Sequence, residues 1–371
     1  MPADAGPPKR IHALLGRRDE PTDGVADYCH FLGKALASRN IEMQAEQIHW
    51  FELGWPRALA WLDTESKNWR GEWVLLQYTA LAWSRRGFPV GALRAARILQ
   101  ANGIRLGIIF HDAVGFEVGR LRDRARLWVQ YMIMRGLYRR SERSILTVPP
   151  ESVEWLPADH SRIAFIPIGA NIPEFLGERT GVGDRAAPTI AVFSITGGPA
   201  GGAEIQDIAF AARRVRERLG AVRLEVFGRG AEMNSAQLGR ALEGSGVALR
   251  LRGVLPAEEV TRTLAASDVL LFVRGLAASR RGTFVSGIAC GMPILGYGEP
   301  GRDPAMDAAG VRLVPWHNTE LFAETLTEIL ADENLRKDLG RRSVNAQKEY
   351  YSWNKIAERY IEALGLQQVA Q

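Results

Sequence analysis

Short apolar runs alternate with longer amphipathic segments along most of this chain. The runs have the length of strands and little polar alternation, which is typical of parallel strands buried on both faces. They predict strands at residues 11–15, 46–50, 73–78, 104–110, 144–148 and 163–167, and then at residues 189–195, 223–227, 249–251, 269–273, 293–298 and 311–314.

The segments between these runs repeat apolar residues at the spacing of one helix face. They predict helices at residues 25–39, 56–63, 118–143, 149–155, 203–219, 235–243, 258–266, 283–290, 320–331, 334–347 and 351–364. Strands that alternate with helices in both halves predict an α/β protein with two doubly wound, Rossmann-like parallel sheets.

The length and one polar segment predict two domains. A chain of 371 residues is long for a single hydrophobic core. Residues 174–188 are rich in glycine and charge and lack apolar periodicity, so we expect a linker between domains at residues 1–173 and 189–348. Right-handed crossovers place the loops that follow the strands along one edge of each sheet, and we expect the two edges to face each other across a cleft.

Composition places the chain among globular proteins. Hydrophobic residues make up 46% and charged residues 24%, and no apolar run is long enough to span a bilayer. The first ten residues lack the apolar core of a secretory signal. Cys29 and Cys290 lie far apart and predict neither a disulfide framework nor a zinc site. We therefore expect a cytoplasmic protein.

The net charge is +5, and arginine supplies nearly all of the cations. A GC-rich codon bias explains such a composition, and no zinc-finger, basic-zipper or RNP pattern supports a nucleic-acid partner. The predicted helix 118–143 carries eight arginines and an apolar face with Trp128 and Met132. It is either a packed helix with a solvated charged face or a helix that lies on an anionic membrane surface.

The stretch from residue 267 to residue 298 carries the first candidate site. A buried strand is followed by a basic loop, residues 274–282, and then by a helix that begins at Thr283. The unpaired N–H groups and the dipole of a helix start favour an anion. Arg280, Arg281 and Thr283 stand at this point. We predict a binding site for a phosphate or diphosphate there.

Loops of the first half carry a second group of candidates. His111 and Asp112 directly follow a buried strand, at the edge where doubly wound sheets bind ligands. Asp23 and Gly24 provide a helix cap and a glycine that a ligand could approach, although an ordinary loop explains them equally well.

Six motifs in order resemble the retaining glycosyltransferases of the GT-B fold, in particular the large family-four group, over nearly the whole chain. They are Asp23-Gly-Val-Ala-Asp27, His111-Asp112, Ile166-Pro-Ile-Gly-Ala-Asn171, Ala265-Ala-Ser-Asp-Val-Leu-Leu-Phe272, Ala289-Cys-Gly-Met-Pro293 and Tyr351-Ser-Trp-Asn-Lys-Ile-Ala357. The last is similar to a C-terminal helix, here residues 349–371, that crosses back to the first domain.

The resemblance implies a nucleotide-sugar site in the second domain and an acceptor site in the first. His111 and Asp112 are the implied catalytic residues. The implied donor residues are Gly197, Gly198, Gly228, Arg229, Gly230, Leu255, Arg280, Arg281, Gly282, Thr283, Phe284 and Ser286. The implied acceptor residues are Gly24, Val25, Asp27, Gln77 and Tyr78.

The chain also departs from the family pattern. The family's two glutamates, which contact the donor sugar and the ribose, would fall at Ala278 and Ser286. The Arg and Lys that clamp the diphosphate are absent from residues 194–202. We expect Arg229, Arg280 and Arg281 to supply that charge instead.

The implied reaction is metal-independent transfer of a sugar, with retention, from a nucleotide sugar to a saccharide or lipid-linked acceptor in cell-surface polysaccharide or glycolipid synthesis. The protein would then work in the cytoplasm or on the inner face of the membrane, with no cofactor. Two alternatives remain open. One is a non-catalytic relative that acts as a partner or regulatory subunit, and the weaker one is a nucleotide-sugar 2-epimerase.

Overall fold

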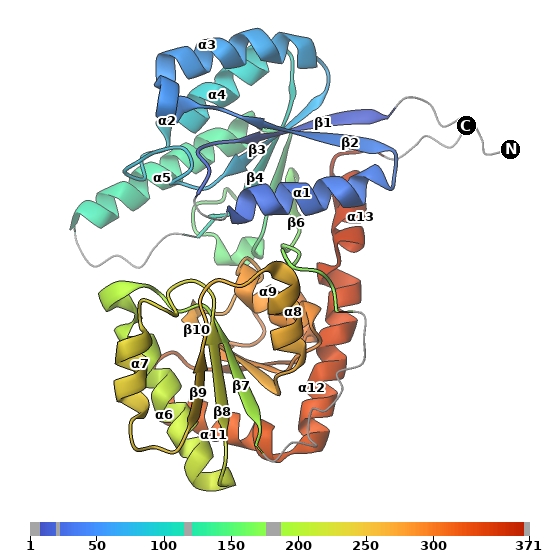
Figure 1. Cartoon of the computed structure of the whole chain (residues 1–371). Coiled ribbons are helices and arrows are strands. Elements are labelled where there is room, and N and C mark those ends of the chain that lie inside the picture. The colour runs from blue at the N-terminus through green and yellow to red at the C-terminus, as the bar shows by residue number, and fades with distance from the viewer. Residues whose placement is uncertain (1–7, 20–22, 115–120, 176–186, 367–371) are drawn as a thin grey trace, which may run out of the picture. The chain divides into compact units, whose positions relative to one another are not determined.

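The computed structural model describes residues 8–19, 23–114, 121–175 and 187–366. It divides into two units, Met1–Pro167 with Trp353–Gln371, and Ile168–Ser352. Each unit contains one six-stranded sheet in which neighbouring strands pair in parallel (Figure 1). The predicted α/β class with two doubly wound sheets is therefore confirmed.

Unit 1 has the strand order β2-β1-β3-β4-β5-β6. Its strands are β1 (Lys9–Leu15), β2 (Ile41–Gln47), β3 (Trp73–Tyr78), β4 (Arg105–Phe110), β5 (Arg143–Leu146) and β6 (Ile163–Phe165). Its helices are α1 (Gly24–Ala37), α2 (Trp50–Leu53), α3 (Trp55–Glu65), α4 (Val90–Ala101), α5 (Leu121–Arg140) and α13 (Trp353–Ala363), with short helices η1 (Ser66–Trp69) and η2 (Pro150–Ser152).

Helices α1 and α13 lie side by side in unit 1. The hydroxyls of Tyr28 and Tyr360 are 2.6 Å apart, and the rings of Phe31 and Trp353 stack at 5.6 Å. Arg39 on the C-terminal turn after α1 pairs with Glu358 at 3.0 Å. These contacts attach the C-terminal helix to α1, although α13 follows the whole of unit 2 in the sequence.

Unit 2 has the strand order β12-β11-β10-β7-β8-β9. Its strands are β7 (Thr189–Phe193), β8 (Arg223–Phe227), β9 (Ala248–Leu251), β10 (Val269–Leu276), β11 (Ile294–Tyr297) and β12 (Val311–Val314). Its helices are α6 (Gly202–Leu219), α7 (Ser235–Leu242), α8 (Ala257–Ala265), α9 (Gly282–Ala289), α10 (Pro304–Ala308), α11 (Thr319–Ala331) and α12 (Glu333–Ala346), with η3 (Gly198–Gly201) and the π-helical turn η4 (Gln347–Tyr351).

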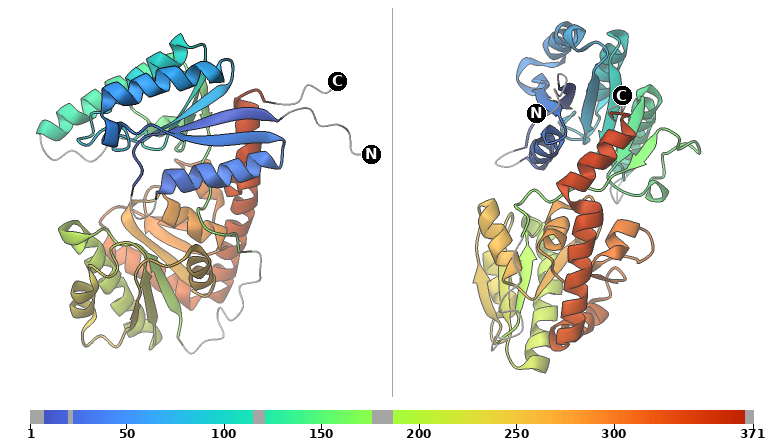
Figure 2. Two further views of the ribbon diagram at one scale, coloured as in Figure 1. Left: turned by 45° about the horizontal axis from the view of Figure 1, so that its top comes forward. Right: turned by 90° about the vertical axis from the view of Figure 1, so that its right-hand side faces the viewer.

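Helices cover both faces of the unit 2 sheet (Figure 2). Along β10, Val269, Leu271 and Val273 pack with residues of α6, α7 and α11, whereas Leu270 and Phe272 pack with α8 and α9. This alternation buries both faces of the strand, which is why β10 is a continuous apolar run in the sequence.

Some predicted elements were wrong or missing. Residues 46–50 are not a strand: β2 ends at Gln47, and Trp50 starts α2. Strand β2 lies at the edge of the sheet and is polar, so the pattern of apolar runs did not predict its bounds. The helix predicted to reach residue 143 ends at Arg140, since Arg143 pairs with Gly107 in the sheet. Helices α4 and α10 were not predicted. Most of the predicted linker, and the start of the predicted helix 118–143, lie outside the described residues.

Candidate functional site

The predicted anion-binding site of unit 2 lies at a helix start that follows the carboxyl end of β10. Helix α9 begins at Gly282, with Arg281 as an extended N-cap, and no side chain of the described residues caps it. Arg280 and Arg281 are half-buried. The Nε of Arg274 on the same strand is buried and lacks a partner among the described residues. The structure thus groups three arginines along β10 and the loop that leads to a helix start, a combination that favours an anion.

A buried network holds this loop. Ser279 is fully buried, and its hydroxyl donates to Asp303 Oδ2 at 2.5 Å and lies 2.8 Å from the hydroxyl of Tyr351. Asp303 also caps α10 by accepting from the backbone N–H of Ala305 at 3.1 Å. Burial raises the pKa of Asp303. Ser279 therefore positions the backbone that carries Arg280, and sequence reasoning did not identify it.

The glycine-rich loop after β7 is less suited to a phosphate. Glu204 in the first turn of α6 accepts from Thr196, from its backbone N–H at 2.8 Å and from its hydroxyl at 2.6 Å. A carboxylate therefore occupies the start of this helix and would repel an anion there. Gly197 and Gly198 were predicted as donor residues, and they lie beside this carboxylate-bearing turn.

The glycines after β8 are explained by close packing of two loops. Gly228 and Gly230 have φ of +90° and +76°, and a Cβ on Gly230 would lie 2.0 Å from the carbonyl oxygen of Ile195. The N–H of Ile195 in turn donates to the carbonyl of Arg229 at 3.0 Å. The glycines therefore allow the loops after β7 and β8 to pack closely. The Arg229 side chain is exposed at the edge of the sheet.

Several predicted donor residues are occupied by contacts within unit 2. Phe284 is fully buried and packs edge-on against Phe272. Leu255 packs against the same core cluster. The hydroxyl of Ser286, which was predicted to replace a ribose-binding glutamate, donates to the carbonyl of Gly282 at 2.8 Å and is 3% exposed. Thr283 is half-buried at the helix start and remains accessible as a candidate.

In unit 1, His111 is held as a neutral imidazole. Its Nε2 lies 2.9 Å from Gln77 Oε1, and Gln77 Nε2 donates to the carbonyl of Leu75 at 3.1 Å. Since the amide nitrogen donates to Leu75, the amide oxygen accepts from His111, so Nε2 carries the proton and Nδ1 is the acceptor. Burial lowers the pKa of His111 to about 4. Gln77, predicted as an acceptor contact, therefore positions His111.

The start of α1 lies against His111. Asp23 caps the helix by accepting from Val25 N–H at 2.9 Å, and the ring of Tyr28 meets the His111 ring edge-on at 5.0 Å. Partial burial and the nearby Asp23 raise the pKa of Asp27. The structure thus brings Gly24, Val25 and Asp27 into the neighbourhood of His111 and Asp112. Tyr78 differs, because it is fully buried against Phe110.

No protein-family model matches the sequence, and no curated protein is detectably similar to it. Solved structures do share its fold. Anabaena HepE, in complex with UDP and glucose, aligns over 97% of this chain and 100% of its own, with 14% identity and a TM-score of 0.64. Sucrose-phosphate synthase of Thermosynechococcus elongatus aligns over 96% and 98%, with 15% identity and a TM-score of 0.70. WaaG, a glycosyltransferase of lipopolysaccharide biosynthesis, aligns over 95% and 99%, with 15% identity and a TM-score of 0.63.

The chain has the GT-B fold. The resemblance to GT-B proteins is thus confirmed at the level of the fold, over nearly the whole chain. Among the described residues, no three side chains of His, Cys, Asp or Glu gather as a metal site.

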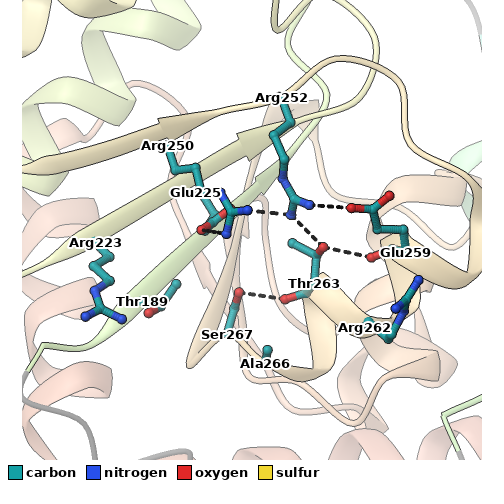
Figure 3. A pocket seen from close by; sticks show the side chains of 10 residues that line it. All are labelled: Thr189, Arg223, Glu225, Arg250, Arg252, Glu259, Arg262, Thr263, Ala266 and Ser267. Atoms are coloured by element: carbon teal, nitrogen blue, oxygen red, sulfur yellow. Dashed lines mark hydrogen bonds and ion pairs between the residues drawn. The ribbon is translucent and has the colours of Figure 1, made fainter.

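A separate pocket of about 320 Å³ lies over β8, β9 and α8, on the α8 face of this GT-B chain's second sheet (Figure 3). Arg252 lies at its centre and pairs with Glu259 at 2.8 Å and Glu225 at 3.4 Å, and it donates to the Thr263 hydroxyl at 2.7 Å. Its charge is therefore neutralised by carboxylates that join strand and helix. We interpret this group as a structural ion-pair network.

We expect Arg252→Gln to lower the free energy of unfolding by about 1–3 kcal/mol, because Glu259 loses its cation and Glu225 is left with the exposed Arg250 at 3.4 Å. Arg262→Gln is the matched control, since its exposed side chain donates to the carbonyl of Glu258 in its own helix and pairs with no carboxylate among the described residues. Chemical denaturation measures both. Equal losses in the two variants would contradict the assigned role of Arg252.

The low pKa of His111 predicts a pH-dependent stability. The unfolded chain binds a proton on this ring below its ordinary pKa of about 6.5, while the folded chain does so only near 4. Stability is therefore lost as the pH falls through that window. We expect His111→Gln to reduce this loss between about pH 6.5 and pH 4, as measured by thermal unfolding. The exposed His160→Gln variant should leave the slope unchanged, and an unchanged slope in His111→Gln would contradict the prediction.

Proposed function

We propose that this protein is a retaining, metal-independent glycosyltransferase that moves a sugar from a nucleotide-sugar donor to a saccharide or lipid-linked acceptor. The observation that carries the proposal is the GT-B fold over nearly the whole chain, shared with HepE, whose structures hold UDP and UDP-glucose. The basic, uncapped start of α9 supports a diphosphate contact in unit 2. Cell-surface polysaccharide or glycolipid synthesis is the proposed setting, as for WaaG.

The proposed chemistry needs charge stabilisation more than it needs a strong base. The bond from the anomeric carbon to the diphosphate breaks, and its electrons leave with the nucleoside diphosphate. The acceptor oxygen bonds to the same face of that carbon, and its proton passes to a diphosphate oxygen. Arg280, Arg281 and the α9 N–H groups would stabilise the leaving charge. His111 is neutral and therefore fits a hydrogen-bonding role toward a sugar hydroxyl through Nδ1.

A second candidate is a non-catalytic relative that serves as a partner or regulatory subunit. It is favoured by Ala278 and Ser286, which stand where the family carries glutamates, and by Glu204, whose carboxylate occupies the start of α6. Such a protein would keep the fold without turning over a donor. The two candidates therefore differ in nucleotide binding and in turnover.

For the enzyme, we expect UDP or another nucleoside diphosphate to raise the melting temperature saturably. Arg281→Ala should weaken this binding by about tenfold or more, because a charge-assisted contact to phosphate is lost. The matched control is Arg213→Ala, an exposed arginine on α6 away from the loops at the carboxyl edge. If no nucleoside diphosphate shifts the melting temperature, the donor site is wrongly assigned.

Turnover of UDP-glucose and other nucleotide sugars with a saccharide acceptor then separates enzyme from relative. We expect His111→Ala to lower kcat by at least about tenfold. Product NMR should show a retained anomeric configuration, and EDTA should leave the rate unchanged. Nucleotide binding without any turnover would favour the non-catalytic relative.

We also propose that the protein works in the cytoplasm, at an anionic membrane surface. Both cysteines are free and buried, which suits a reducing compartment. Every helix among the described residues is too short or too polar to cross a bilayer. On α5, Trp128 and Met132 are 65% and 45% exposed, and Arg124 and Arg139 flank them on the same exposed stripe. Tryptophan favours the membrane interface, and arginine favours anionic headgroups.

The double variant Trp128→Ser/Met132→Ser should reduce co-sedimentation with phosphatidylglycerol vesicles, because the exposed apolar part of the stripe is removed. Met233→Ser is the control, since Met233 is 73% exposed but lies in unit 2. Pure phosphatidylcholine vesicles should bind the protein less. Binding that is equal for both lipids, or unchanged in the double variant, would argue against this surface.

A further inference from the structure

A pocket of about 460 Å³ opens in unit 1 near the carboxyl ends of β2, β1 and β3. Its walls combine Trp50, Trp55 and Trp83 with Arg85, Arg86 and Arg94. These residues come from α2, α3, the loop after β3 and the start of α4. None of them was a predicted site residue, because no single stretch of sequence contains the group.

Three stacked tryptophan rings form the aromatic wall of the pocket. The rings of Trp50 and Trp55 stack at 5.1 Å with 3° between their planes, and Trp55 and Trp83 stack at 6.3 Å. Helix α4 approaches this stack closely, since a Cβ on Gly91 would lie 2.0 Å from the Trp55 ring. Trp55 stays half-buried, and Phe88 at the rim is 41% exposed. Trp50 and Trp83 are buried, at 6% and 0% exposure. Trp55 and Phe88 therefore provide the aromatic surface that can contact the apolar C–H face of a sugar ring.

The pocket carries three arginines and, in the part of the chain that the structure describes, no acidic lining residue. Arg85, Arg86 and Arg94 are exposed, and none of them pairs with a carboxylate of the described residues. Arg85 lies over the Phe51 ring at 4.0 Å, with Arg17 at 4.2 Å. Among the described residues, helix α4 has no acidic residue in its first turn and no side-chain cap. Arginines and a helix start that face one pocket without a counter-charge favour an anionic ligand.

One residue connects this pocket to the candidate catalytic histidine. The indole N–H of Trp83 donates to the backbone carbonyl of Gln77 at 2.8 Å. The side chain of that same Gln77 holds His111 at 2.9 Å. The backbone of Gln77 thus holds Trp83 of the pocket wall, and the side chain of Gln77 holds His111.

We infer that this pocket is an acceptor subsite that binds an acidic saccharide, with its carboxylate or phosphate on Arg86 and Arg94 and its ring against Trp55 and Phe88. The inference rests on the proposed glycosyltransferase function, whose acceptor it specifies. A bidentate arginine contact distinguishes such an acceptor from its neutral analogue.

The test measures binding by calorimetry, with UDP present to fill any donor site. The probes are methyl α-glucuronide for a carboxylate, glucose 1-phosphate for a phosphate, and methyl α-glucoside as the neutral sugar. We expect at least one acidic probe to bind at least about tenfold more tightly than the neutral one. Arg86→Gln/Arg94→Gln should remove this preference. Arg97→Gln, on the same helix but not lining the pocket, should keep it.

Equal binding of acidic and neutral probes would overturn the inference, as would an unchanged preference in the double variant. If the double variant keeps sugar binding and instead loses binding to phosphatidylglycerol vesicles, the pocket is a lipid contact and the inference is also overturned. Nucleotide binding is measured separately in the same samples. A lost nucleotide response with an intact acidic preference would reject the proposed donor chemistry and not the pocket.

Discussion

Parallel strand pairing is the constraint on which the rest of this structure depends. A parallel sheet needs a crossover between successive strands, and the helices in those crossovers bury both of its faces. The polar chemistry of each unit is then concentrated in the loops at the strand ends. His111 after β4 and Arg280 after β10 are two outcomes of the same rule, one in each unit.

The candidate groups are held by residues that have no direct chemical role. Gln77 fixes the orientation and tautomer of His111, and Ser279 fixes the loop that carries Arg280 through its bonds to Asp303 and Tyr351. Tyr351 stands about seventy positions away in the chain, so this support exists only in the folded unit. The same logic applies to Trp83, whose indole bond to Gln77 connects the basic aromatic pocket to the histidine.

The starts of helices α6, α1 and α9 differ in whether a carboxylate lies there. The start of α6 is occupied by Glu204, that of α1 by Asp23, and that of α9 by no side chain of the described residues. An anion is therefore disfavoured at the first two and favoured at the third. Ala278 and Ser286 carry no charge near this third start, so they do not offset its positive potential.

The apolar pattern alone determined the fold class. A central strand is buried on both faces, so its sequence is a continuous apolar run. Strands β3, β8 and β12 were predicted with the bounds they have. The polar edge strand β2 was misplaced, since all but one of its residues are partly or fully exposed and need not be apolar. His111 was predicted as a candidate catalytic residue from its place after a strand. Its neutral state depends on burial and on Gln77. The tryptophan–arginine pocket depends on α2, α3, α4 and the loop after β3, which meet only at a sheet edge. Such properties arise from contacts between distant segments, so only the tertiary structure decided them.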